Sequence, residues 1–270
     1  MGKWLILAAI AVLGVAVQAD DILSTMGNMS ANQPPDCTSY REIVGKYLHL
    51  PQFTESKETN GIVSEVCKRL PDREQVSAVA YGYARSGADE DDKNLTFALI
   101  NDSKHSVIAS YTSDVAEDAL TKLGSASFSI DTARYRLRED VRAIGLRYDS
   151  AARGPSCADG ASWSWLILFV QSGSRLEPIL DLPLGRRRSF GDCGHGGGES
   201  AEITIGVEQT RHHGYADLRL TAHVEPYGAE NERPEKSTTQ TYVLHFDGKH
   251  YVPDGIPPWW AESLSSDIVR

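Results

Sequence analysis

Between residues 76 and 252 the chain alternates apolar and polar positions with a period of two, the pattern of half-buried β-strands. Most gaps between these runs are short and turn-like, so we expect consecutive strands to be antiparallel neighbours. The pattern therefore predicts a β-meander and not a wound α/β sheet. The expected strands cover residues 76–81, 95–100, 107–111, 128–137, 141–148, 164–171, 175–182, 201–209, 217–225, 239–246 and 251–252.

Three segments have signals of helix instead. Apolar residues at three- and four-residue steps predict two short helices, over 39–48 and 62–70. A third helix is expected over 114–123, because Asp114 and Glu117 form a capping-box pattern at its start. The predicted fold class is mainly β (α+β): an antiparallel meander or sandwich with two N-terminal helices and one inserted helix.

A weak internal repeat leaves a second architecture open. Residues 168–178 and 244–253 both have the order strand, glycine turn, strand and proline, with spacings that differ by one residue. Recurring hairpins of this kind also occur in propeller-like sheets. The meander or sandwich and the propeller-like arrangement are therefore both compatible with the pattern.

The N-terminus has the pattern of an export signal. Lys3 precedes an apolar run over 4–17, and small residues at 17 and 19 suit a signal-peptidase cut. The run is shorter than the ~20 residues of a membrane span, so we expect no span after cleavage. We therefore expect a periplasmic or secreted protein. Its parts are a signal peptide (1–19), a disordered lead (20–36) and one β-rich domain (37–270) with an N-terminal helical cap (37–71).

Charge and size narrow the classes of partner. The 270 residues have a net charge of −10, which repels phosphate backbones and anionic lipid headgroups. We therefore expect no nucleic-acid partner. The length is sufficient for a sizeable apolar core.

The four cysteines, Cys37, Cys67, Cys157 and Cys193, predict two disulfides if the chain is exported. Three pairings are possible. We favour Cys37–Cys67 and Cys157–Cys193, because each pair closes a loop of about thirty residues, a stabilisation of roughly 3–4 kcal/mol on the loop-entropy model. The chain has no C-x-x-C motif, so a thioredoxin-like centre and a zinc knuckle have no support.

Histidines near the C-terminus are the candidate metal ligands. Asp247 and Gly248 are expected to form a two-residue turn that places His245 across from His250 on one face of the sheet. Two imidazoles on one face can share a transition metal, and histidines 212, 213 and 223 on an adjacent hairpin could complete the set. Structural or solvent-facing histidines are the alternative.

Trp259 and Trp260 follow two prolines outside any expected strand. Paired aromatic residues can stack on sugar rings or on a peptide, so both are candidate binding residues. Alternatively, the C-terminal segment folds back over the sheet and closes the core.

No motif assigns catalytic residues or a cofactor. Residues 195–198 copy the oxyanion loop of some esterases, but no G-x-S-x-G nucleophile elbow accompanies them. Phosphate-loop and dinucleotide-binding motifs are also missing, so we expect no cofactor. Carboxylates such as Asp131, Asp181 and Asp217 could form a hydrolase site only if folding brings such groups together.

Residues 131–137, 141–147 and 246–251 resemble segments of exported, uncharacterised β-rich proteins of Gram-negative bacteria. The resemblance extends over most of residues 67–252. It implies a periplasmic location and assigns no activity or functional residue.

We therefore expect an exported, disulfide-stabilised, non-catalytic protein that binds a protein, peptide or glycan partner of the cell envelope. One alternative is a periplasmic hydrolase with a carboxylate and histidine site formed in the fold. The other is a transition-metal-binding protein that uses His245 and His250.

Overall fold

The computed structural model describes residues 37–50, 53, 61–84, 92–154, 159–190, 197–228 and 236–262. All of them belong to one unit, residues 35–270. The expected signal peptide (1–19) and lead (20–36) lie outside the described residues. Within those ranges no helix has the length and apolar character needed to cross a membrane.

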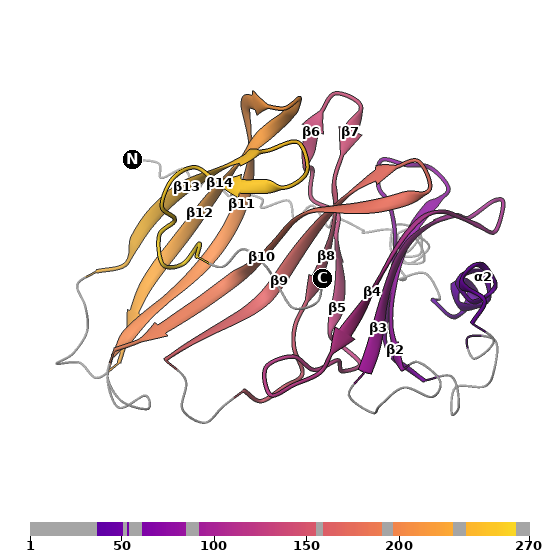
Figure 1. Cartoon of the computed structure of the whole chain (residues 1–270), viewed down its shortest axis with the longest axis horizontal. Helices are drawn as coiled ribbons and strands as arrows, with labels where there is room; N and C mark the ends of the chain where they lie inside the picture. The colour runs from indigo at the N-terminus through magenta and orange to yellow at the C-terminus, as the bar shows by residue number, and fades with distance from the viewer. Residues whose placement is uncertain are drawn as a thin grey trace, which may run out of the picture. The chain divides into compact units, whose positions relative to one another are not determined.

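The fold is mainly β, as the hydrophobic pattern predicts, with a large and mostly antiparallel sheet that does not close into a barrel (Figure 1). Twelve strands form this sheet in the order β1-β2-β3-β4-β10-β11-β12-β13-β14, with β5, β8 and β9 branching from β10. Because twelve of the fourteen described strands share one sheet and the other two, β6 and β7, form a small hairpin, the described strands are not arranged as separate propeller blades. The strands are β1 (Ile62–Arg69), β2 (Val76–Ala84), β3 (Asp92–Asn101), β4 (Ser106–Ala116), β5 (Phe128–Asp131), β6 (Arg136–Arg138), β7 (Val141–Arg142), β8 (Ile144–Tyr148), β9 (Gly160–Ser172), β10 (Arg175–Ser189), β11 (Gly198–His212), β12 (Tyr215–Tyr227), β13 (Thr238–Phe246) and β14 (Tyr251–Pro253).

Strand β9 contributes to two cores at once. Its residues 166–170 are an unbroken apolar run, and all five are buried. Successive side chains on a strand point to opposite faces. Leu166, Leu168 and Val170 accordingly pack in the core beside β11 to β13, whereas Ile167 and Phe169 pack in the core beside β2 to β4. A continuous apolar run is therefore explained by burial on both faces of the strand.

Pairing between β4 and β10 is minimal. The two strands are parallel there, and one residue pair, Ser110 with Arg175, connects them. A backbone hydrogen bond from Ser110 to the carbonyl of Ser174 (3.1 Å) supports this contact. Side-chain packing adds to it, because Phe169 of β9 contacts Phe97 of β3 with ring centroids 5.0 Å apart.

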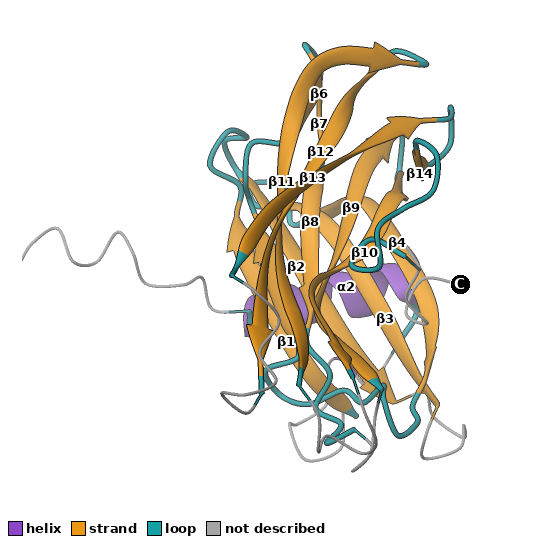
Figure 2. Ribbon diagram, turned by 90° about the vertical axis from the view of Figure 1, so that its left-hand side faces the viewer, coloured by secondary structure: helices purple, strands orange, loops and turns teal. Residues whose placement is uncertain are grey.

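Helix α2 (Thr38–Leu48) confirms the first predicted helix and covers one face of the β1–β3 region (Figure 2). Its Tyr40 and Val44 are buried against a cluster that includes Val79 and Tyr81 of β2. The Cys37–Cys67 disulfide attaches the start of the helix to β1, as the favoured pairing predicts. Cys157 and Cys193 lie outside the described residues.

The helix predicted over 62–70 is wrong, because this segment is the edge strand β1. The four-residue spacing of Ile62, Val66 and Leu70 fits a strand as well as a helix, because four is a multiple of the strand period of two. A bulge between Ile62 and Ser64 places Ile62 in a different core cluster from Val66 and Leu70. Its β-branched residues, Val63 among them, fit a strand better than a helix.

The helix predicted over 114–123 is also wrong. Strand β4 continues to Ala116, and an irregular segment follows it. The Glu117 carboxylate does accept a backbone hydrogen bond, but from Leu123 (2.7 Å), and it also forms a nearly buried ion pair with Lys93 (3.6 Å). An acidic residue that satisfies backbone donors in a turn produces the same sequence signal as a helix cap.

The single strand predicted over 128–137 is interrupted after Asp131. The Asp131 carboxylate accepts a hydrogen bond from the backbone N–H of Ala133 (2.8 Å), and this local turn ends β5. The strand predicted over 141–148 is likewise divided into β7 and β8. Strand β7 pairs with β6 in a small separate hairpin, whereas β8 pairs with β5 and β9.

Candidate functional site

A cleft of about 670 Å³ lies where the tips of several hairpins meet. Its lining residues come from β4, β6, the β9–β10 hairpin, the β11–β12 hairpin and the β13–β14 turn (Figure 1). This volume is within the range of about 300–1,000 Å³ typical of small-molecule sites. The lining residues are Tyr111, Arg138, Val170, Arg175, Glu177, Pro178, Ile179, His213, Tyr215, Phe246, Gly248, Lys249 and His250.

The floor of the cleft is apolar and aromatic. Val170, Ile179 and Phe246 are buried core residues that also line the cleft. Tyr215 packs on Phe246 with ring centroids 4.5 Å apart, and both belong to or contact the same core. The residues that form the floor of the cleft are therefore held in place by the core of the sheet.

The rim of the cleft is cationic, in contrast to the net charge of −10 of the chain. Arg175 and Lys249 are exposed, and neither has an ion-pair partner among the described residues. Arg138 is held by Asp140 (Nη2 to Oδ2, 3.0 Å) and lies 5.8 Å from the centre of the Tyr215 ring. Glu177 is the one acidic residue in the described lining, so positive charge predominates there.

The β13–β14 turn differs from the predicted two-residue turn. Four residues, 247–250, connect the strands, and the Asp247 carboxylate accepts hydrogen bonds from the backbone N–H of Lys249 and His250, both at 2.7 Å. Gly248 has φ +103°, which other residues rarely adopt. The longer turn changes the register, so Val252 and not His250 lies opposite His245. The predicted pairing of His245 with His250 is therefore wrong, and His250 instead lines the cleft.

His245 instead lies beside Asp217 and His212. A bulge in β11 creates this arrangement, because residues 208–210 face the single residue Asp217 of β12. The Asp217 side chain is 1% exposed. Its Oδ1 atom lies 2.7 Å from Nδ1 of His212 and 3.1 Å from Nδ1 of His245. The two imidazole centroids are 4.0 Å apart.

Contacts within this cluster shift the pKa values of Asp217 and His245 in opposite directions. Burial by itself raises the pKa of Asp217, but interactions with Thr210, His212 and His245 outweigh it and hold the pKa below its usual range. Burial lowers the pKa of His245, but its contacts with Asp217 and Asp254 outweigh that effect and raise it. Sequence analysis named His212 among the histidines that could complete a metal set with His245, but it did not identify Asp217 as their partner, to which the bulge brings both.

The C-terminal tryptophans belong mainly to the core. Trp260 is fully buried, and its indole N–H donates a hydrogen bond to the side chain of Gln240 (2.8 Å). A buried ring cannot stack on an external ligand, so the binding role proposed for Trp260 is wrong. Trp259 is partly buried against the same core, and the Arg188 guanidinium lies 4.6 Å from the centre of its ring. The C-terminal segment therefore folds back over the sheet, which is the alternative that the sequence left open.

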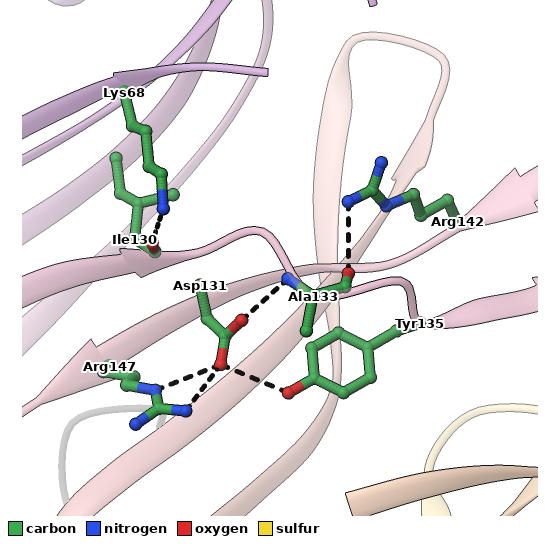
Figure 3. A network of polar contacts seen from close by, with 7 residues as sticks. All are labelled: Lys68, Ile130, Asp131, Ala133, Tyr135, Arg142 and Arg147. Atoms are coloured by element: carbon green, nitrogen blue, oxygen red, sulfur yellow. Dashed lines mark hydrogen bonds and ion pairs between the residues drawn. The ribbon is translucent and has the colours of Figure 1, made fainter. Parts of the chain in front are cut away.

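A second pocket, of about 460 Å³, includes a polar network around Asp131 (Figure 3). Asp131 accepts hydrogen bonds from the backbone of Ala133, from Arg147 (Nη2, 2.8 Å) and from Tyr135 (3.2 Å). Both carboxylate oxygens are thus occupied by the protein. This network fixes the connection between β5 and β6.

The Asp131 network predicts a pH dependence of stability. Burial raises the pKa of Asp131, but the Ala133 N–H and the Arg147 guanidinium outweigh burial and lower it. A lowered folded-state pKa stabilises the fold above the unfolded pKa of about 4, and this stabilisation is lost as the pH falls through the folded-state value. We expect Asp131→Asn to lower the free energy of unfolding by about 1–3 kcal/mol at pH 7.

Urea unfolding of the native protein and of Asp131→Asn at pH 7 and at pH 2.5 measures this effect. The difference between the two proteins should shrink at the lower pH, because Asp131 is then protonated in a growing fraction of molecules, whereas the asparagine is neutral at both pH values. A difference that stays constant over this range would contradict the assignment to charge.

Comparisons with models of known protein families, with curated proteins and with solved structures find no match to this chain.

Proposed function

We propose that this protein is an exported, non-catalytic binding protein, and that its ligand is a small organic anion with an apolar body. The observation that carries the proposal is the convergence of Arg138, Arg175 and Lys249 on an apolar cleft of about 670 Å³. The export part of the proposal rests on the pattern of the first nineteen residues.

The chemistry of the cleft favours this class of ligand. An apolar floor with a few charged groups is typical of small-molecule sites, because burial supplies affinity and the polar groups fix orientation. Arginine can bind a carboxylate or phosphate through two parallel hydrogen bonds. Arg175 is available for such a contact, whereas Arg138 already binds Asp140. The side chains of Tyr111 and Tyr215 provide aromatic surface for the rest of the ligand.

Two fluorescent probes that differ by one charged group test the proposal. The probe 8-anilinonaphthalene-1-sulfonate is anionic, and N-phenyl-1-naphthylamine has the same aromatic body without the sulfonate. We expect the native protein to bind the sulfonate more tightly. Arg175→Gln and Lys249→Gln should each weaken this binding about fivefold, since a partly exposed ion pair contributes about 1 kcal/mol.

Lys104→Gln is the matched control, because it removes the same charge from the exposed β3–β4 turn, away from the cleft lining. It should leave the affinity unchanged, whereas the double variant of Arg175 and Lys249 should lose most of the preference for the sulfonate, because only Arg138 remains among the three cationic residues. Equal affinity of the native protein for the two probes would contradict the proposal. An equal loss in the Lys104 control would contradict it as well, because the effect would then reflect overall charge.

A further inference from the structure

The bulge in β11 gathers three groups that a metal ion could bind together. Ligand atoms of His212, Asp217 and His245 all lie within 4.8 Å of one another. The residues come from two neighbouring strands and from the strand next to them in the sheet, so the sheet itself holds the arrangement. The cluster is separate from the lining of the cationic cleft, so a metal site in it does not depend on the ligand proposed for that cleft.

Two buried polar atoms in this cluster have no good partner among the described residues. Oδ2 of Asp217 accepts no well-directed hydrogen bond from a described residue, although the Thr210 side chain also interacts with this carboxylate. Nδ1 of His245 is also buried, and its approach to Oδ1 of Asp217 at 3.1 Å is poorly directed for a hydrogen bond. An unsatisfied buried polar group is destabilising, and native structures contain few of them. Two such atoms side by side are explained if a cation binds both.

The orientation of the His245 ring is also suitable for binding a metal ion. Its Nε2 atom lies 3.1 Å from a carboxylate oxygen of Asp254. An Nε2–H group that donates to this carboxylate leaves the lone pair of Nδ1 directed toward Asp217. Metal-binding histidines usually have such a carboxylate or carbonyl partner on the other ring nitrogen, which fixes the ring and its tautomer.

The donor set selects the class of metal. Two imidazoles and one carboxylate are typical ligands of zinc and of other divalent transition metals, whereas calcium and magnesium prefer sites made of oxygen atoms. Three protein ligands also leave at least one coordination position for water. The His212 side chain is half exposed, so an ion can reach the cluster from solvent.

We propose that His212, Asp217 and His245 form a binding site for one divalent transition-metal ion, with zinc as its simplest occupant. Asp254 is a positioning residue that holds His245. Metal binding at Nδ1 of His212 releases to solvent any proton held there, and it adds a link among β11, β12 and β13 to the pairing that already connects them.

Zinc titration of the full chain, expressed without a histidine tag and treated with a chelator, tests the site. We expect one zinc ion per chain, with a dissociation constant in the micromolar range or below. A hundredfold excess of zinc over the dissociation constant should raise the melting temperature by about 5–10 °C. Cobalt should bind as well and give the visible absorption of a nitrogen- and oxygen-ligated ion.

Single-residue variants distinguish zinc binding at this site from zinc binding to other histidines on the surface. His212→Ala and His245→Ala should each weaken zinc binding at least tenfold, which reduces the rise in melting temperature at the same zinc concentration to about half or less. His213→Ala removes the exposed histidine next to His212 and should retain both effects, as should His223→Ala on the same sheet.

The melting temperature of each chelator-treated variant shows whether it still folds. Should His245→Ala fail to fold, His212→Ala decides, because this half-exposed ring is not part of the core. The proposal is overturned if zinc binds more weakly than about 100 µM, or if His212→Ala and His213→Ala change its affinity equally.

Discussion

Replacing Phe169 with alanine is expected to lower the free energy of unfolding by about 3–5 kcal/mol, the usual loss for a buried phenylalanine. Phe169 is fully buried on β9, and its ring contacts the rings of Phe97 (5.0 Å) and Tyr111 (5.1 Å). These contacts connect β9 to β3 and β4. They matter because β4 and β10 share a single residue pair. Truncation of this ring should therefore weaken the attachment of the first four strands.

Urea denaturation followed by circular dichroism measures this loss, and Phe190→Ala is the matched control. Phe190 is 45% exposed and packs mainly under the Arg188 guanidinium, whose central carbon lies 5.1 Å from the ring centre. The same truncation of a phenylalanine to alanine, made at position 190, should lower the free energy of unfolding by less than about 1 kcal/mol. Similar losses at the two positions would contradict the stabilising role assigned to the buried Phe169 ring.

Removing the Cys37–Cys67 disulfide by the double substitution Cys37→Ala/Cys67→Ala is expected to lower the free energy of unfolding by about 3–4 kcal/mol. The bond joins residues 30 positions apart and so restricts the unfolded chain. The folded state should keep α2 in place, because Tyr40 and Val44 remain buried. Arg41 also donates a hydrogen bond to Glu65 of β1 (2.7 Å).

Unfolding of the native protein and of this variant, each with and without a reducing agent, separates the contributions. The native protein should lose at least as much stability on reduction as the variant has lost already. Any further effect of the reductant on the variant reports a bond between Cys157 and Cys193, which the cysteine spacing favours. A variant as stable as the oxidised native protein would contradict the loop-entropy argument.

The sequence pattern identifies β-strands well where both the strand and its neighbours are regular. Strand β2 is the simplest case, because its mainly apolar residues from Val76 onward pair with β1 and with β3 along the strand. The pattern fails where local chemistry imitates another structure. Glu117 satisfies the Leu123 backbone N–H in an irregular segment, and an aspartate or glutamate before an apolar run has the same appearance at the start of a helix.

The candidate sites were harder to predict, because they depend on register. His245 was a candidate from sequence, but the partner assigned to it depends on the length of one turn. A four-residue turn in place of a two-residue turn moves His250 into the cleft. The role of Asp217 depends on the bulge that places residues 208–210 opposite it, and the sequence contains no glycine or proline to mark that bulge. The cationic cleft combines residues from five separate segments, so spacing along the chain contains no signal for it.

The two-sided burial of β9 also limits how this protein can change over evolutionary time. Alternate residues of that strand pack in different cores. A substitution that fits one core can therefore shift the β9 backbone and disturb the packing of the other core. Recombination cannot exchange either half as an independent module, because β9 belongs to both. Variation should instead accumulate at the hairpin tips, where new ligand specificities can arise without disturbing the shared strand.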